Sequence, residues 1–180
     1  MLKIESDRDL EKFLRRYRIA KPGKFSLDDH DPGDTDGLDG EAKEAAELLL
    51  ARSIEWMAEQ QPMLAAQDRW SLLLIFQGRD AAGKDSMIRA VMSGLNPQGC
   101  QVKSFKHPHH EDLDHDYLWR YHAHVPGRGE IGIFNRSHYE EVLIVRVHKA
   151  HLEAQKLPPE LIGEDIWQQR FETSITLSVI

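Results

Sequence analysis

The chain has 180 residues, 41% of them hydrophobic and 29% charged, which are the proportions of an ordinary globular protein with one sizeable core. Its formal net charge is −7, so no overall basic field attracts nucleic acid, and binding of a polyanion requires a local basic patch. The single cysteine, Cys100, excludes a disulfide within the chain. The charged N-terminus and the short apolar runs predict neither a signal peptide nor a membrane span. We therefore expect a cytoplasmic protein that binds neither nucleic acid nor membrane.

The N-terminal part of the chain predicts an extension that precedes the main domain. Residues 6–17 have the composition of a short charged helix, and residues 21–40 form an acidic segment rich in glycine, proline and aspartate. From residue 41 to about residue 67, apolar residues recur at helical spacing among good helix formers, which predicts one long helix with a core-facing stripe. We expect an N-terminal helix and connecting segment over 1–40 and the main domain over 41–180.

Three short apolar runs, each followed by a helical pattern, make up the rest of the main domain. Residues 70–76 are apolar except for Ser71, which predicts a strand buried on both faces, and further strands are expected over 100–105 and 130–135. Residues 174–180 have the composition of an additional edge strand. This alternation predicts an α/β fold with a doubly wound parallel sheet flanked by helices. The helices are expected to end near Gly94 and to cover 111–125 and 137–150.

The residues after the first strand fit a phosphate-binding loop. The sequence GRDAAGKDS over 78–86 matches the pattern G-x-x-x-x-G-K between a buried strand and a helix. The glycines let the backbone turn its N–H groups toward phosphate oxygens, the helix N-terminus adds a positive dipole, and the lysine adds a charge. Asp85 stands where a serine or threonine usually follows the lysine, so the usual magnesium ligation is not expected. Phosphate contacts are expected from Gly78, Arg79, Ala81, Ala82, Gly83, Lys84, Asp85 and Ser86.

Two further residues are candidates for the chemistry. Asp80 lies inside the loop, where a carboxylate beside phosphates is unfavourable unless it holds a cation, so we expect it to bind Mg²⁺. The alternative is that it stabilises the turn through its own backbone. Arg136 follows the third strand, whose end lies beside the loop in a doubly wound sheet, and its guanidinium could grip phosphate oxygens. We expect Asp80, Lys84 and Arg136 to be the catalytic residues.

Five motifs follow one another along the chain. In order they are GRDAAGKD, MSGLNPQGCQV, SFKHP, LDHDYLWR and IGIFNRSHYEEVLIVRVH. This series resembles the polyphosphate kinase 2 family, and the resemblance covers roughly residues 40 to 170. It implies a P-loop kinase fold that transfers a terminal phosphoryl group between inorganic polyphosphate and a nucleoside mono- or diphosphate. It further implies Mg²⁺ as cofactor, AMP, ADP, ATP, GDP or GTP as nucleotides, and a possible homo-oligomer.

The resemblance also implies roles for residues outside the loop. Asn135 and Arg136 match the family's second motif, in which an acid is normally expected at the position of Asn135. The metal is therefore expected to depend on Asp80, with help from Glu140. Because other members carry a non-acidic residue at that position, Glu140 is also expected to bear on the choice of nucleotide. Lys106 and Arg120 stand in matching motifs and are expected to extend a local basic track for phosphate.

The resemblance ends near Phe171, and the sequence leaves several functions open. Family members continue with another core strand and a helical lid, so we expect this chain to be cut short before its lid, with its own activity undecided. One alternative is a P-loop kinase that uses ATP as donor for another small acceptor. Another is a non-catalytic remnant that binds phosphate or assembles with full-length copies. A nucleic-acid-binding module is disfavoured, because the chain has no basic stripe interleaved with aromatic residues.

Overall fold

The computed structural model describes residues 11–12, 14–15, 17–19, 23, 25–34 and 43–177. The chain divides into two compact units, Met1–Trp56 and Met57–Ile180. The helix expected over residues 6–17 lies partly outside the described residues, but those described between 11 and 17 are helical. The expected domain boundary at residue 40 also lies outside them and stays a prediction. Among the described residues, no helix is long and apolar enough to cross a membrane.

Apart from the helical residues between 11 and 17, the described part of the first unit contains two regular elements with defined bounds. A 3-10 helix, η2 (Leu27–Asp29), begins after Ser26, whose hydroxyl accepts a hydrogen bond from the Asp28 N–H at 3.4 Å. The long helix α2 (Lys43–Gln67) confirms the helix expected from residue 41, and it continues into the second unit. Its predicted apolar stripe is only partly correct, because Met57 packs into the core whereas Met63 is 54% exposed.

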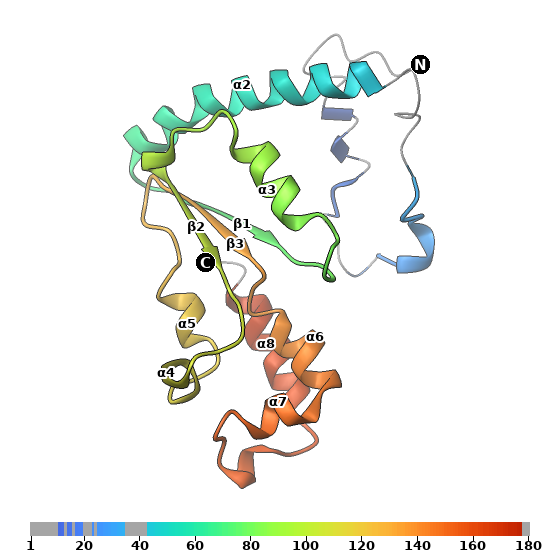
Figure 1. The fold of residues 1–180 in the computed structure, drawn as a ribbon, viewed down its shortest axis with the longest axis vertical. Coiled ribbons are helices and arrows are strands. Elements are labelled where there is room, and N and C mark those ends of the chain that lie inside the picture. Colours follow the sequence, from blue (N-terminus) through green and yellow to red (C-terminus); the bar gives the residue numbers. More distant parts are fainter. Residues whose placement is uncertain are drawn as a thin grey trace. The chain divides into compact units, whose positions relative to one another are not determined.

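The second unit is built on a three-stranded parallel sheet with the order β1-β3-β2 (Figure 1). The strands are β1 (Leu72–Phe76), β2 (Cys100–Ser104) and β3 (Ile131–Asn135). The register aligns the last residues of β1 and β2 with Asn135, so all three strands end at one level. The expectation that residues 70–76 form the fully buried strand is wrong. The central strand β3 is buried, whereas β1 borders the sheet of the described residues and is half-buried.

Helices cover both faces of this sheet, which confirms the doubly wound architecture. Because side chains alternate along a strand, Ile131 and Ile133 of β3 face α3 (Lys84–Met92) and the C-terminal half of α2, where they pack with Ile88 and Leu64. Phe134 faces the opposite side. There it packs with Phe105, with Leu118 and Tyr121 around α5 (Trp119–His122), and with Leu177 of α8 (Ile166–Leu177). A 3-10 turn, η4 (Pro97–Gly99), leads into β2.

Three helices gather beyond the carboxyl end of β3 (Figure 1). They are α6 (Glu140–Val147), α7 (Lys149–Glu153) and α8, with the 3-10 turn η5 (Pro159–Leu161) between the last two. Val145, Leu152 and Ile166 form a separate small core among them. The single helix expected over 137–150 is therefore two helices, because the backbone of His148 leaves the helical region at φ −111° and ψ 89°.

Two other expectations about local structure are wrong. The helix predicted over 111–125 is split into α4 (His110–Leu113) and α5, because the Asp116 carboxylate accepts the backbone N–H of Leu118 at 2.9 Å and closes a turn between them. The strand predicted over 174–180 is the end of α8 as far as Leu177. The residues after Leu177 lie outside the described part of the chain.

Gly129 permits the close approach of β3 to α2, and its replacement should be costly. Its φ is +76°, and a Cβ atom built on it would lie 3.1 Å from the Ala65 Cα and 3.2 Å from the Ala65 carbonyl oxygen. We expect Gly129→Ala to lower the free energy of unfolding by about 1–3 kcal/mol, as left-handed strain at a non-glycine residue does. Urea denaturation measures the change. Gly163→Ala is the matched control, because no heavy atom lies within 4 Å of its built Cβ; equal stability of the two variants would contradict the prediction.

Candidate phosphate-binding site

The loop between β1 and α3 has the geometry of an anion cradle. Ala81 and Gly83 have positive φ values of 60° and 85°, and the Gly83 carbonyl accepts the Met87 N–H at 2.9 Å as α3 begins. Successive residues in such conformations direct backbone N–H groups into one concavity. Lys84, the first residue of α3, folds back over the loop and donates its Nζ to the carbonyl oxygens of Gly78 and Arg79, at 2.8 and 2.7 Å. A positive charge is thus fixed at the helix N-terminus, where anions are favoured.

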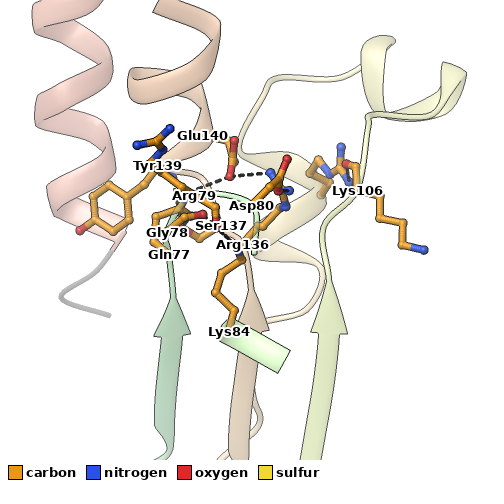
Figure 2. Close-up of polar contacts among 11 residues, drawn as sticks. Gln77, Gly78, Arg79, Asp80, Lys84, Lys106, Arg136, Ser137, Tyr139 and Glu140 are labelled. Atoms are coloured by element: carbon orange, nitrogen blue, oxygen red, sulfur yellow. Dashed lines mark hydrogen bonds and ion pairs between the residues drawn. The ribbon is translucent and has the colours of Figure 1, made fainter. Parts of the chain in front are cut away.

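Arg136 reaches the same loop from the end of β3. Its backbone N–H donates to the carbonyl oxygen of Phe76 at 3.0 Å, and its φ of 65° lies in the left-handed region. Its guanidinium forms an ion pair with Asp80 through Nη2 and with Glu140 through Nη1, the latter at 3.2 Å (Figure 2). The strained backbone and the two carboxylates together aim this side chain at the loop.

Asn135 and Asp85 explain how the loop accommodates its unusual residue after Lys84. The Asn135 amide donates to the Asp85 carboxylate at 2.5 Å. Asp85 lies in the first turn of α3, where the helix dipole favours a negative charge. The neutral residue of this pair, Asn135, therefore ends β3, and the acidic one, Asp85, lies at the start of α3. This arrangement keeps a carboxylate at the edge of the loop even though Asn135 has no charge.

Two cavities meet at Arg136. The first has a volume of about 780 Å³ and is lined by the loop from Asp80 to Ser86 together with Ser104, Phe105, Lys106, Asn135 and Arg136. The second, of about 340 Å³, shares Phe105, Lys106 and Arg136 with the first, and much of its wall is apolar. A molecule that occupied both cavities would have its charged part at the loop and its apolar part against the wall of the second cavity.

The structure thus brings together most of the candidate residues. Asp80, Ala81, Ala82, Gly83, Lys84, Asp85, Ser86, Lys106, Asn135 and Arg136 line the first cavity. Gly78 and Arg79 contribute the carbonyl oxygens that hold Lys84, and Glu140 and Arg120 line the second cavity. Lys106 points away from the group around Arg136 in Figure 2.

Arg120 has a different setting from the other basic residues. It is 9% exposed, donates Nη2 to the carbonyl oxygen of Lys106 at 2.9 Å, and lies 3.3 Å from the Asp112 carboxylate. Its guanidinium also lies 5.4 Å from the centre of the Phe105 ring. Its Nε has no hydrogen-bond partner among the described residues. These contacts hold the segment that carries Lys106, so Arg120 supports the wall between the two cavities.

Sequence reasoning missed Gln77 and Ser137, which lie directly beside the predicted residues. Gln77 donates Nε2 to the Glu140 carboxylate at 2.7 Å, and its Oε1 accepts the Ser137 hydroxyl at 3.1 Å (Figure 2). The Ser137 hydroxyl oxygen also accepts the Tyr139 N–H at 3.2 Å. The available signal was position alone: each follows the end of a parallel strand, where ligand-binding side chains collect.

A buried ionic network behind the second cavity was also missed. The Glu141 carboxylate, 4% exposed, accepts hydrogen bonds from Gln155 at 2.6 Å and from Arg170 at 3.1 Å. Arg170 also donates to Gln155 at 2.6 Å and lies 4.5 Å from the centre of the Tyr117 ring. Burial raises the pKa of Glu141, while its hydrogen bond from Gln155 and the Arg170 charge oppose this rise. The network ties α6 to α8.

His138 gives the site a predictable response to acid. The residue is fully buried and donates Nε2–H to the Ser174 carbonyl oxygen at 3.1 Å, and burial lowers its pKa below the ordinary value of 6.5. The unfolded chain then binds the proton more readily, so the stability from His138 is present above pH 6.5 and is lost as the pH falls through its folded pKa. We expect the unfolding midpoint to fall between about pH 7 and pH 5, less steeply in His138→Gln. Parallel pH profiles of the two proteins would contradict this.

The carboxylates of the loop fit a magnesium ion that is shared with phosphate. Mg²⁺ in phosphate sites is usually held by one or two carboxylates, with phosphate oxygens and water completing its octahedron. The Asp80 side chain is 84% exposed at the first cavity, and Asp85 lines the same cavity. Within the described residues, no group of three or more metal-ligating side chains is arranged to hold a metal by itself. The donor set therefore suits a metal that arrives with phosphate.

A parallel sheet with helices on both faces, a cradle after its first strand and an arginine at the neighbouring strand end define a P-loop kinase-like domain. The family model of polyphosphate kinase 2 matches residues 39–159. The chain belongs to the polyphosphate kinase 2 family, which confirms the resemblance read from its motifs.

Curated relatives and solved structures agree with this assignment. The ADP-polyphosphate phosphotransferase of Rhodopseudomonas palustris is 52% identical over 134 residues, which cover 74% of this chain and 46% of the relative. The AMP/ADP-polyphosphate phosphotransferase of Meiothermus ruber is 41% identical, over 88% of this chain and 55% of the relative. The crystal structure of polyphosphate kinase 2 from Arthrobacter aurescens matches with a TM-score of 0.63 and 40% identity, over 73% of this chain and 49% of that one. The chain spans about half the length of these proteins.

Proposed function

We propose that this site transfers a terminal phosphoryl group between inorganic polyphosphate and a nucleoside mono- or diphosphate, with Mg²⁺. The observation that supports it best is that Lys84 of the loop and Arg136 of the neighbouring strand end line one cavity, in a chain of this family. Two relatives are named as polyphosphate phosphotransferases that act with ADP or with AMP and ADP.

The chain's own residues act by position and charge. The attacking group is a phosphate oxygen of the acceptor nucleotide, which is ionised at neutral pH and needs little help from a base. The loop N–H groups hold the transferring group in line, and Lys84 and Arg136 neutralise the charge that spreads over its oxygens. Both cations are held beside the loop before phosphate enters, Lys84 by loop carbonyls and Arg136 by two carboxylates.

Asp80 is the residue that would hold the magnesium ion, with Asp85 beside it. When bound, the ion supplies Lewis-acid charge to the phosphate oxygens. Both Asp80 and Glu140 are paired with Arg136, but Asp80 suits this role better because its side chain is 84% exposed and lies within the loop. Glu140 is 17% exposed and accepts a further hydrogen bond from Gln77. The metal therefore depends on Asp80 more than on Glu140 in this proposal.

The second cavity would receive the nucleoside part of the acceptor. Its wall includes Pro108, Ile144 and Val145, which suit the faces of a base or a ribose. It joins the loop cavity at Arg136 and Lys106, so an acceptor phosphate would meet the transferring group there. Glu140 lies in the same wall and would influence which base is accepted.

The test is a turnover assay with the purified chain, Mg²⁺, polyphosphate and either AMP or ADP, followed by chromatography of the nucleotides. Product that requires polyphosphate supports the proposal. Product formed with ATP as donor to another acceptor, and not with polyphosphate, supports a different P-loop kinase. Binding of polyphosphate without product identifies a non-catalytic phosphate binder and overturns the proposal.

A further inference from the structure

Gln77 occupies the junction between the first strand and the loop, and its side chain contacts neither cavity. It is half-buried and follows Phe76, the last residue of β1. Its amide reaches the segment after β3. There Nε2 donates to the Glu140 carboxylate at 2.7 Å, and Oε1 accepts a hydrogen bond from the Ser137 hydroxyl at 3.1 Å. A backbone hydrogen bond links the same two segments, from the Arg136 N–H to the Phe76 carbonyl oxygen at 3.0 Å. Gln77 thus ties together the two strand ends that form the site.

The orientation of this amide follows from its partners. A carboxylate accepts hydrogen bonds and does not donate when ionised, so the NH₂ group of Gln77 must face Glu140. The Gln77 carbonyl then faces the Ser137 hydroxyl, which donates to it while its oxygen accepts the Tyr139 N–H at 3.2 Å. The opposite orientation would place the Gln77 carbonyl oxygen against the carboxylate. Only one orientation therefore satisfies all four groups.

The same carboxylate oxygen that accepts from Gln77 also accepts from Arg136. Glu140 Oε1 lies 2.7 Å from Gln77 Nε2 and 3.2 Å from Arg136 Nη1. Gln77 therefore fixes the acceptor that holds one edge of the guanidinium, while Asp80 holds the other. These two contacts hold the direction of the Arg136 guanidinium, whose backbone has φ of 65°.

We propose that Gln77 is a positioning residue for Arg136 and acts through Glu140. The proposal rests on the proposed function, in which Arg136 binds the transferring phosphate. Glutamine suits this position because its amide donates to Glu140, whereas a glutamate would place two carboxylates in contact. Like charges at that distance repel, so one carboxylate must turn away or bind a proton. If Glu140 turns away, Arg136 loses its second acceptor; if the new carboxylate turns away, Glu140 loses the donor that fixes its position.

Binding of inorganic tripolyphosphate with Mg²⁺, measured by calorimetry, tests this without involving a nucleotide. We expect Gln77→Met, which removes both hydrogen bonds and adds no charge, to weaken binding about tenfold, the size of effect expected from losing one hydrogen bond to a charged group. Gln77→Glu should weaken binding at least as much. In the exchange variant Gln77→Glu/Glu140→Gln the amide at position 140 donates to the new carboxylate and its oxygen can accept from Arg136, at the same net charge. It should therefore bind more tightly than Gln77→Glu.

The control is a second glutamine–glutamate contact far from the site. Gln101 donates Nε2 to the Glu130 carboxylate at 2.8 Å on the exposed surface, so Gln101→Glu makes the same chemical change elsewhere and should leave the affinity unchanged. Unfolding midpoints measured in parallel distinguish lost positioning from lost stability. Wild-type affinity in Gln77→Met, or an exchange variant as weak as Gln77→Glu, would overturn the inference. A wild-type chain that binds no tripolyphosphate would overturn the proposed function itself.

Discussion

Replacing Lys84 with alanine should reduce polyphosphate-dependent transfer to about a hundredth of the wild-type rate or less, in line with the loss of a preorganised charge at a transferring group. The ammonium group donates hydrogen bonds to the carbonyl oxygens of Gly78 and Arg79, at 2.8 and 2.7 Å. At this position it would contact a phosphate bound in the loop. Without Lys84, only Arg136 of these two cations remains to stabilise the negative charge that develops on the transferring group. The measurement is the initial rate of nucleotide formation at saturating polyphosphate.

The control for this variant is Lys149→Ala, which removes an exposed lysine at the start of α7. It should retain the wild-type rate, because an exposed charge away from the loop is screened by salt. Near-full turnover in Lys84→Ala would refute the assigned role of the loop. A similar loss in both variants would show that general charge, and not the position of Lys84, determines the rate.

Arg170→Met should lower the free energy of unfolding by about 3–5 kcal/mol, the typical effect of removing one partner from a buried ion pair. Arg170 and Glu141 are 3% and 4% exposed, so the substitution leaves a carboxylate buried with only Gln155 as donor. Urea denaturation at neutral pH measures the loss. The double variant Glu141→Gln/Arg170→Met removes the buried charge as well, and it should recover much of the stability.

The pH dependence of the same variant provides a second check. Burial raises the folded pKa of Glu141, so the protonated form is favoured in the folded chain, and stability is lost as the pH rises through that pKa. Without Arg170 the rise in pKa is larger, so Arg170→Met should regain stability relative to wild type on acidification. Arg15→Met is the control, because Arg15 and Glu11 form an exposed pair, and its midpoint should stay at the wild-type value.

The sequence predicted the residues whose positions are determined by local structure. The loop motif by itself fixes Lys84 at the start of a helix, and the parallel sheet requires Arg136 to emerge beside it. Both residues lie where the sequence placed them: Lys84 depends on the strand and turn before it, and Arg136 on the parallel pairing of β3 with β1. The motifs showed an acid at Asp85 and a neutral amide at Asn135, but only the structure shows the hydrogen bond between them.

The sequence could not reveal contacts that depend on the arrangement of distant elements. Gln77 and Glu140 are 63 residues apart, and nothing in either segment indicates the other. Arg170 becomes buried where α8 packs against α6 at Glu141 and where Gln155 and Tyr117 cover its guanidinium. A buried arginine in an amphipathic segment resembles a surface residue until its partner helix is known.

The strand wrongly predicted after residue 174 has a physical explanation. Residues 174–177 include β-branched side chains, which favour strands in isolation. In α8 the hydroxyls of Thr173 and Thr176 donate to the carbonyl oxygens four residues earlier, at 2.6 and 2.9 Å, so these side chains find partners along the helix. Ser174 and Leu177 are buried at a spacing of one helical turn, and this packing outweighs the local preference.

The internal pairing of the two cations has a consequence for which anions the loop accepts. Lys84 is held by two carbonyl oxygens and Arg136 by two carboxylates, so every entering anion competes with oxygens of the protein. Chloride or acetate carries a single charge and gains little by displacing them. A phosphate chain presents several charges that engage both cations and the loop N–H groups together. Under the proposed function, we therefore expect this pairing to favour ligands that carry several charges, so that the loop binds phosphate chains in preference to simple salts.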